Sequence, residues 1–211
     1  IPAKVSVTSL VHAAEQTTLE RPGFLSKDGL TAAEMGTALH AFLEHADFGA
    51  LAAVRDAEDA AVLDAVRAER ERQLTSPAIA GKLDVYKILR FLRSEAFRRI
   101  CGAEDVLREL AFITSLPAAE VMAAQGRALP DGPAADAGVL VQGIADIVLI
   151  YPDHLELLDY KTDRRKTPAD FVRAYRAQLE LYARAIDKRF APRRVTYKGI
   201  YSLELGELIE V

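Results

Sequence analysis

The spacing of apolar and polar positions divides the chain into a helical first half and a second half rich in strands. After Thr31-Ala-Ala-Glu34, which has the form of a helix capping box, apolar residues recur at helical spacing. An alanine-rich run from 50 to 74 carries charged residues on its other face and is interpreted as one amphipathic helix or a pair of them. A third helical pattern covers about residues 85–94.

The second half alternates dense apolar runs with turn-forming residues. The pattern predicts a strand at 106–113, a mobile loop at 129–138, a hairpin of strands 139–150 and 155–160, a helix from Pro168 to about Lys188, and a last strand at 195–201. Pro168 suits a first helical turn that Thr167 caps. We therefore expect one α/β domain over residues 1–211, with a helical part at about 1–104 and a catalytic core at about 105–211.

Composition places the chain among ordinary globular proteins. It has 211 residues, of which 50% are hydrophobic and 27% are charged, and it has no apolar run of about 18 residues that would predict a transmembrane helix. The first twenty residues do not have the pattern of a signal peptide. Because the chain begins at Ile1 without an initiator methionine, we expect it to be a fragment of a longer protein.

Cysteine and histidine are too few for several kinds of metal site. Cys101 is the single cysteine, which excludes a disulfide framework, a four-thiolate zinc site and a cysteine-ligated iron–sulfur cluster within the chain. The four histidines make a cage built only from histidine unexpected. A metal bound here would rely on carboxylates, which favours Mg²⁺, with Mn²⁺ as a substitute.

Charge is distributed unevenly along the chain. The net charge of −4 argues against a nucleic-acid partner, but residues 161–198 contain twelve Lys or Arg and four Asp or Glu. This stretch therefore carries +8 and the remainder −12. Such asymmetry is typical of a basic contact surface on an acidic scaffold, and the alternative is a basic helix whose charges only face solvent.

Two acids and a lysine stand within the apolar runs of the predicted hairpin. Asp159 and Lys161 are two residues apart on one strand, so both side chains point to the same face. Asp146 lies on the preceding strand, and the short turn allows it to lie beside Asp159. Buried carboxylates are costly unless a cation compensates them, so we expect a divalent-ion site with Lys161 beside it. The alternative is a plain ion pair of Asp159 with Lys161 at a strand edge.

These residues resemble the catalytic core of the PD-(D/E)XK nuclease superfamily. Four segments occur in the order found in its RecB-type branch: Gly36-Thr-Ala-Leu-His40, Gly143-Ile-Ala-Asp146, Leu158-Asp-Tyr-Lys-Thr-Asp163 and Tyr175-Arg-Ala-Gln-Leu-Glu-Leu-Tyr182. The resemblance covers about residues 30–205. It implies a restriction-endonuclease-like α/β fold, with a central mixed sheet flanked by helices and a helical N-terminal part.

Within that branch, both ends of the chain are similar to the AddA-type family of helicase–nuclease proteins. The similar segments are 2–10 and 200–211. AddB-type and CRISPR-associated relatives carry an iron–sulfur cluster on four cysteines, which the single Cys101 does not allow. The resemblance therefore favours the AddA type.

The resemblance also implies roles for single residues. It implies that His40, Asp146 and Asp159 bind the metal ion, with the backbone carbonyl oxygen of Tyr160 as a further ligand. It implies that Lys161 is the catalytic lysine, which positions a water or offsets negative charge in the transition state.

Further residues are expected around this centre. The resemblance implies that Tyr175 and Gln178 line the site from the following helix and either contact the substrate phosphate or orient Lys161. The spacing puts Tyr175, Gln178 and Tyr182 on one helix face, where the two tyrosines could instead be core residues. Glu109 resembles the acid of the first strand, which approaches the metal through water or at a second position, and an exposed strand residue is the alternative.

Basic residues near the site are candidates for contact with DNA phosphates. Arg164, Arg165 and Lys166 directly follow the strand of Asp159, and Arg173 and Arg176 lie on the next helix. The alternative is that these side chains are only solvated.

The leading hypothesis is metal-dependent DNA hydrolysis of low sequence specificity. The resemblance implies a bacterial, cytoplasmic exonuclease that processes double-strand break ends for recombinational repair and receives single strands, 3′-terminated by analogy. No Walker A motif occurs, so this chain has no nucleotide site, and helicase domains are expected upstream in the parent chain. An AddB-type protein is the expected protein partner, and no contact with a membrane is expected.

Two other hypotheses remain. One is a catalytically inactive nuclease fold that acts as a DNA clamp or as an AddB-docking surface. The other is a stand-alone recombination nuclease of the same superfamily.

Overall fold

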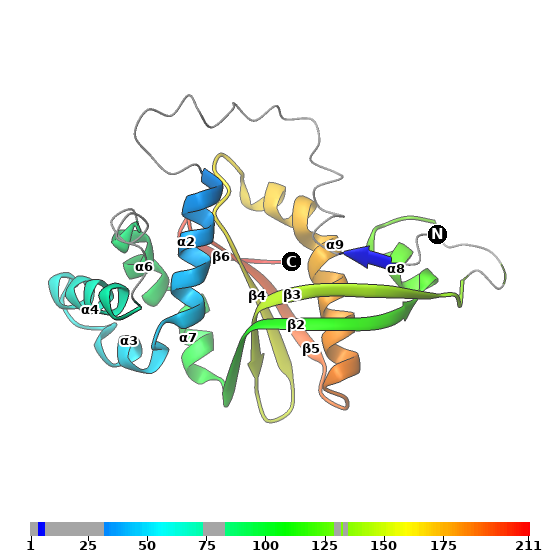
Figure 1. The fold of residues 1–211 in the computed structure, drawn as a ribbon, viewed down its shortest axis with the longest axis horizontal. Coiled ribbons are helices and arrows are strands. Elements are labelled where there is room, and N and C mark those ends of the chain that lie inside the picture. Colours follow the sequence, from blue (N-terminus) through cyan, green and yellow to red (C-terminus); the bar gives the residue numbers. More distant parts are fainter. Residues whose placement is uncertain (1–3, 7–31, 74–82, 129–131, 133–134) are drawn as a thin grey trace.

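The structure is a computed structural model that describes residues 4–6, 32–73, 83–128, 132 and 135–211. Its elements are β1 (Lys4–Ser6), α2 (Ala32–His45), α3 (Phe48–Val54), α4 (Asp59–Arg72), α6 (Val85–Leu92), α7 (Glu95–Gly102), β2 (Asp105–Pro117), α8 (Ala118–Ala124), β3 (Gly138–Ile150), β4 (Leu155–Lys161), α9 (Pro168–Arg189), β5 (Val195–Ser202) and β6 (Glu207–Glu210). Figure 1 shows the N-terminal helices on one side of the sheet and α9 with α8 on the other.

In the described part of the chain, six strands form one mixed sheet around β3. The order is β1-β3-β4-β5-β6, and β2 pairs with the other edge of β3 along its whole length. β1 is parallel to β3 at residues 140–142, and β4 is antiparallel to β3 at residues 147–150. Because β1 and β4 share one edge of β3, residues 143–146 face a gap between them. Asp146 lies at the end of this gap.

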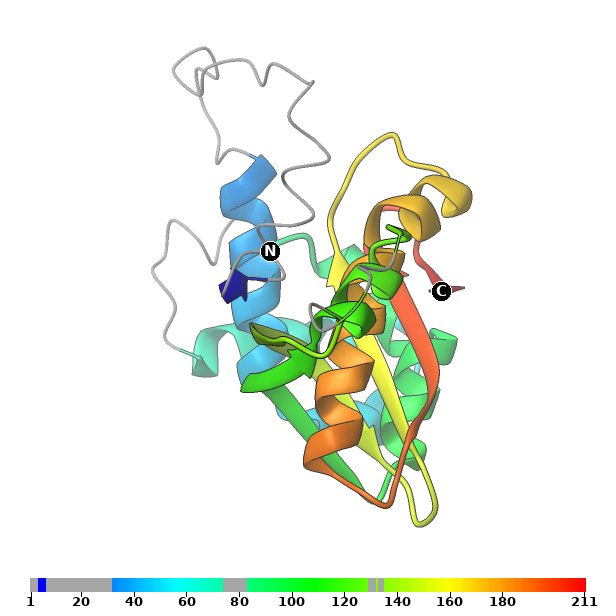
Figure 2. The ribbon, with the colours of Figure 1, turned by 90° about the vertical axis from the view of Figure 1, so that its right-hand side faces the viewer.

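Two apolar cores occupy the two faces of the sheet. α9 and α8 cover one face, where Leu157 packs with Phe171 and Leu179. The N-terminal helices cover the other face, where Leu158 packs with Phe91. Neighbouring residues of β4 therefore enter opposite cores, which explains why six of its seven residues are buried. The turned view in Figure 2 shows α2 and α9 separated by the strands.

The mixed α/β fold and the main predicted elements are confirmed. The alanine-rich run forms a pair of helices, α3 and α4, because the chain turns between Arg55 and Glu58. Residues 139–150 and 155–160 lie in an antiparallel hairpin. α9 begins at Pro168, where Thr167 and Asp170 form a capping box, and it ends one residue beyond the predicted Lys188.

Other elements differ from the prediction. The part at about 1–104 is not entirely helical, because β1 adds a strand whose hydrogen-bond partners come from β3. α7, α8 and β6 were not predicted, since each is short and packs through tertiary contacts. β2 spans thirteen residues, longer than 106–113, because twelve of them pair with β3. Thr31 of the expected capping box and residues 129–131 and 133–134 of the expected mobile loop at 129–138 lie outside the described residues.

Among the helices that the structure describes, none combines the length and the hydropathy that crossing a bilayer requires.

Gly143 is expected to be intolerant of a side chain. A Cβ atom at this position would lie 2.8 Å from Tyr182 Cε1 and 2.9 Å from Phe112 Cζ, two ring atoms in a packed core. Gly143→Ala should therefore lower the free energy of unfolding by about 1–3 kcal/mol, measured by urea denaturation. Gly102→Ala is the control, because nothing lies within 4 Å of its Cβ position. Equal stability of both variants would contradict this packing.

Candidate active site

The candidate site begins where β2 and β3 both depart from regular pairing. Arg108 pairs with Ile147 and Leu110 with Ala145, while Glu109 and Asp146 between them form no regular pair. Glu109 has a φ of 48°, a left-handed conformation that is unusual for a residue other than glycine. Such strained backbone is concentrated at functional sites.

Helix α2 adds an imidazole to these two acids. The Nδ1 atom of His40 lies 3.6 Å from Asp146 Oδ2, and one potential ligand atom from each of His40, Glu109 and Asp146 lies within 4.8 Å of the others. Two carboxylates and one imidazole at this spacing can hold a divalent cation. Glu109 thus lies beside Asp146 and His40, in the position expected for an acid near the metal.

The close approach of α2 to the segment after β4 depends on a glycine. Gly36 is buried one turn before His40, and a Cβ atom there would lie 2.9 Å from Thr162 Oγ1. α2 therefore packs against the residue that follows β4. At its other end, Arg108 donates hydrogen bonds to the carbonyl oxygens of Leu43 and Ala46 at 3.1 and 2.6 Å. Arg108 precedes Glu109, so it links the end of α2 to the strand that carries the acid.

Strand β4 brings a third acid, Asp159, and Lys161 to the same place. The backbone N–H of Tyr160 donates to Asp146 Oδ2 at 2.8 Å, so the Asp146 carboxylate occupies the position where a strand carbonyl would normally accept. Asp159 is 2% exposed and forms an ion pair with Lys161. Asp159 is not in the group of His40, Glu109 and Asp146, because its carboxylate is directed to Lys161.

The electrostatics of the site indicate an excess of buried negative charge. Burial raises the pKa of Asp146 to about 6, against the opposing effects of Lys161 and the Tyr160 N–H. Burial also raises the pKa of Asp159 to about 6, although Lys161 lowers it. Burial and Glu44 raise the pKa of Glu109. These carboxylates and the imidazole fit a hard divalent ion, which would supply the missing positive charge.

The two basic groups of the site shift in opposite directions. Burial lowers the pKa of His40, and Lys161 lowers it further, so the imidazole is neutral at pH 7 and able to bind a metal. Burial by itself lowers the pKa of Lys161, but Asp159 and Asp146 raise it overall. Lys161 therefore remains an ammonium ion beside the acids.

Helix α9 places Tyr175, one of the predicted residues, beside Lys161. Tyr175 is 6% exposed, and its ring centroid lies 4.7 Å from Lys161 Nζ. Gln178 is buried one turn further along the helix. The sequence allows Tyr182 to be either a site residue or a core residue. Its ring packs against that of Phe112, with 5.1 Å between the centroids.

The predicted DNA contacts fall into two groups. Arg164, Arg165 and Arg176 are exposed, and so is Arg173, which forms an ion pair with Asp170. Lys166 instead points inward: its Nζ atom lies 2.8 Å from Asp163 Oδ1 and 3.3 Å from the Tyr175 hydroxyl. Its position therefore favours an internal contact over a phosphate contact.

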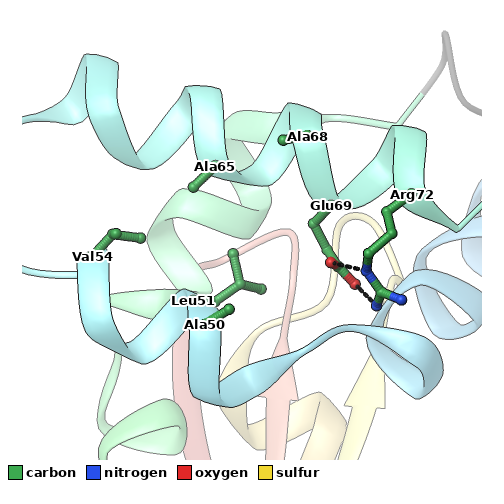
Figure 3. Close-up of a pocket in the computed structure, with 7 residues that line it drawn as sticks. All are labelled: Ala50, Leu51, Val54, Ala65, Ala68, Glu69 and Arg72. Carbon is green, nitrogen blue, oxygen red and sulfur yellow. Dashed lines mark hydrogen bonds and ion pairs between the residues drawn. The ribbon is translucent and has the colours of Figure 1, made fainter.

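A groove of about 360 Å³ between α3 and α4 is separate from this site. It is lined by Ala50, Leu51, Val54, Ala65, Ala68, Glu69 and Arg72. Figure 3 shows the ion pair of Glu69 with Arg72 at one end of the groove. Glu69 also accepts hydrogen bonds from Asp47 N and Gln73 Nε2, which indicates a structural role. None of the predicted site residues lines this groove.

Sequence comparison identifies the family of the chain. The sequence matches the PD-(D/E)XK nuclease superfamily over residues 12–206. The chain belongs to this superfamily. The sheet that carries Asp146, Asp159 and Lys161 is therefore the nuclease core of the family, and its fold agrees with the expected one.

Curated relatives narrow the relationship within the superfamily, and all three named here are AddA-type subunits of an ATP-dependent helicase/nuclease. This chain is 34% identical to the subunit from Moorella thermoacetica, over 98% of this chain and 15% of that protein. The relative from Pelotomaculum thermopropionicum is 34% identical over 97% of this chain, and that from Bacillus velezensis 31% over 95%. The chain spans only about 15–17% of the length of these relatives. It is homologous to their C-terminal region.

Two residues of the site were missed by sequence reasoning. No sequence pattern predicts the contact of Arg108 with the end of α2, because the two segments are about 60 residues apart in the chain. Asp163 was quoted only as part of a motif, although it is two residues beyond Lys161 and binds Tyr175. Its contact could have been suspected only from the pairing of that loop with α9.

Proposed function

We propose that this nuclease domain hydrolyses phosphodiester bonds of DNA with Mg²⁺, which Mn²⁺ can replace. The observation that carries the proposal is the convergence of His40, Glu109 and Asp146 next to the buried pair of Asp159 and Lys161. A catalytically inactive fold would not need two carboxylates with raised pKa values and a lysine in one buried place.

In this proposal His40, Asp146 and Asp159 hold the metal, with the carbonyl oxygen of Tyr160, and Glu109 either binds it or orients a water on it. The bound ion supplies charge neutralisation at the phosphate and lowers the pKa of a water. Asp159 could offer one carboxylate oxygen to the metal while its Oδ2 atom pairs with Lys161. The ammonium of Lys161 is then available to position the attacking water or to stabilise negative charge on the phosphate.

We further propose that residues 1–211 act as one domain of a bacterial, cytoplasmic helicase–nuclease that processes double-strand break ends. The helicase/nuclease relatives named above support this context. The substrate would be single strands released by helicase domains of the parent chain, with an AddB-type protein as partner. Arg164, Arg165, Arg173 and Arg176 would contact phosphates in this proposal, which their solvent-exposed side chains support.

The purified 211-residue chain should degrade end-labelled single-stranded DNA in the presence of Mg²⁺ or Mn²⁺ and stop when EDTA is added. Asp146→Asn should abolish this activity and weaken the binding of Mn²⁺ measured by calorimetry. Asp153→Asn, in the exposed turn between β3 and β4, is the matched control and should retain both. If the wild-type chain binds DNA but neither binds Mn²⁺ nor cleaves, the domain is a clamp and the proposal is wrong.

A further inference from the structure

The ammonium of Lys161 has a second neighbour besides Asp159. Its Nζ atom lies over the ring of Tyr175, 4.7 Å from the centroid. Lys161 and Tyr175 are both largely buried, at 17% and 6% exposure, so water weakens this cation–π contact little. Asp159 is also a proposed metal ligand. The ring of Tyr175 is therefore a contact of the ammonium that does not depend on Asp159.

The ring of Tyr175 is held from its hydroxyl end. The hydroxyl group donates to both carboxylate oxygens of Asp163, at 3.0 and 2.9 Å. Lys166 Nζ donates to the same hydroxyl at 3.3 Å and forms an ion pair with Asp163 at 2.8 Å. Phe171 stacks on the ring one turn earlier in α9. Asp163 therefore links the segment after β4 to the helix that carries Tyr175.

The position of Asp163 has an electronic consequence as well as a geometric one. A carboxylate that accepts a hydrogen bond from a phenol draws the proton towards itself and leaves more negative charge on the ring. A cation over the ring face is attracted by that negative charge. Lys166 opposes part of this effect, because its own ammonium lies 4.8 Å from the same centroid.

We propose that Asp163 is a positioning residue that acts through Tyr175 to hold the ammonium of Lys161 over the ring. The inference rests on the proposed nuclease function, because the purpose of a fixed Lys161 is to meet the water or the phosphate. Asp163 itself touches neither the metal ligands nor the substrate in this assignment. Lys166 completes the same network through its contacts with Asp163 and Tyr175.

The placement can be tested by NMR in the absence of metal. A methylene group next to an ammonium that lies over an aromatic ring is shifted upfield by the ring current. In protein labelled with ¹³C-lysine, the Cε signal assigned by Lys161→Met should show this shift. Tyr175→Leu should abolish it, and Asp163→Ala should reduce it. Asp163→Asn keeps an acceptor for the hydroxyl and should restore most of it.

The catalytic consequence can be tested with the same variants in the DNA-cleavage assay. Asp163→Ala and Tyr175→Leu should lower kcat by roughly tenfold or more while KM for DNA changes little, because the ammonium is misplaced but the DNA contacts remain. Tyr175→Phe keeps the ring and should lie between them and wild type. Ile186→Val is the control, because it removes buried packing from the same helix three turns away from Tyr175.

The outcomes separate this inference from the proposed function. Absence of the upfield Lys161 signal in the wild-type chain overturns the inference, as does an Asp163→Ala variant with wild-type kcat and an unchanged signal. A loss of kcat in Ile186→Val equal to that in Asp163→Ala would show that only packing matters, and would also overturn it. If the wild-type chain cleaves no DNA with any divalent metal, the proposed function fails, while the NMR arm still decides the position of Lys161. Should Tyr175→Leu not fold, Tyr175→Phe and Asp163→Ala decide.

Discussion

Lys161→Met should reduce DNA cleavage by about 10²–10⁴-fold, the range expected when a group that acts on the reacting water or phosphate is removed. Methionine has a similar volume and no charge, so the apolar stem of the side chain keeps its packing. The substitution also removes the ammonium that lowers the pKa values of Asp146 and Asp159. Both carboxyls should therefore hold their protons to a higher pH, and metal binding at pH 7 should weaken.

These two consequences differ in their pH dependence. At pH 9 both carboxyls are ionised in the variant as well, so the binding of Mn²⁺ should recover while cleavage should not. The measurement is single-turnover cleavage and Mn²⁺ calorimetry at pH 7 and pH 9. Lys87→Met is the matched control, because Lys87 of α6 also forms an ion pair, in its case with Glu204. Full recovery of cleavage at pH 9 would mean that Lys161 acts only by keeping the carboxylates ionised.

Asp146→Asn should make the metal-free domain more stable at neutral pH while it abolishes cleavage. The pKa of Asp146 is about 6 in the folded chain against an ordinary value of 3.8. The folded state therefore binds more protons than the unfolded state between these values, and the free energy of unfolding falls as the pH rises through this window. Above pH 6 the full cost of the buried charge is present. Asparagine lacks that charge and can still accept from the Tyr160 N–H.

The size of this effect follows from the shift in pKa. One pKa unit corresponds to 1.36 kcal/mol, so the shift of Asp146 represents on the order of 2–3 kcal/mol. For a domain of this length each kcal/mol changes Tm by about 2–4 °C. At pH 8 with EDTA, Asp146→Asn should therefore melt several degrees above wild type, and near pH 4 the difference should disappear. Added Mn²⁺ should raise the Tm of wild type more than that of the variant.

The matched control is an acid that carries no such cost. Asp64 lies on the exposed face of α4 and pairs with Arg67, so Asp64→Asn should change the free energy of unfolding by less than about 1 kcal/mol at pH 8. An Asp146→Asn variant that melts below wild type at pH 8 without metal would show that the Asp146 carboxylate stabilises the fold, and the electrostatic account of the site would be wrong.

The elements with strong local signals were predictable from the sequence alone. Thr167 and Pro168 mark the start of α9 through backbone geometry that depends on neighbouring residues only. The β3–β4 hairpin follows from a β-branched run and a leucine-rich run around a short turn. The period of two along β4 predicts that Asp159 and Lys161 share a face. β1 and β6 were missed because three or four residues form a strand only when a partner strand is present.

The sequence by itself determined the fold class, the order of the main elements and the candidate residues of the site, because periodicity, caps and motif spacing are local properties of the chain. Only the tertiary structure decided which of those residues meet. The left-handed backbone at Glu109 accompanies a carboxylate oxygen that lies near Asp146. The close approach of α2 at Gly36 brings the imidazole of His40 to the same place. The contact of Asp163 with Tyr175 likewise joins a loop to a helix. Such distances depend on how layers pack, and packing is the sum of many contacts between residues far apart in sequence.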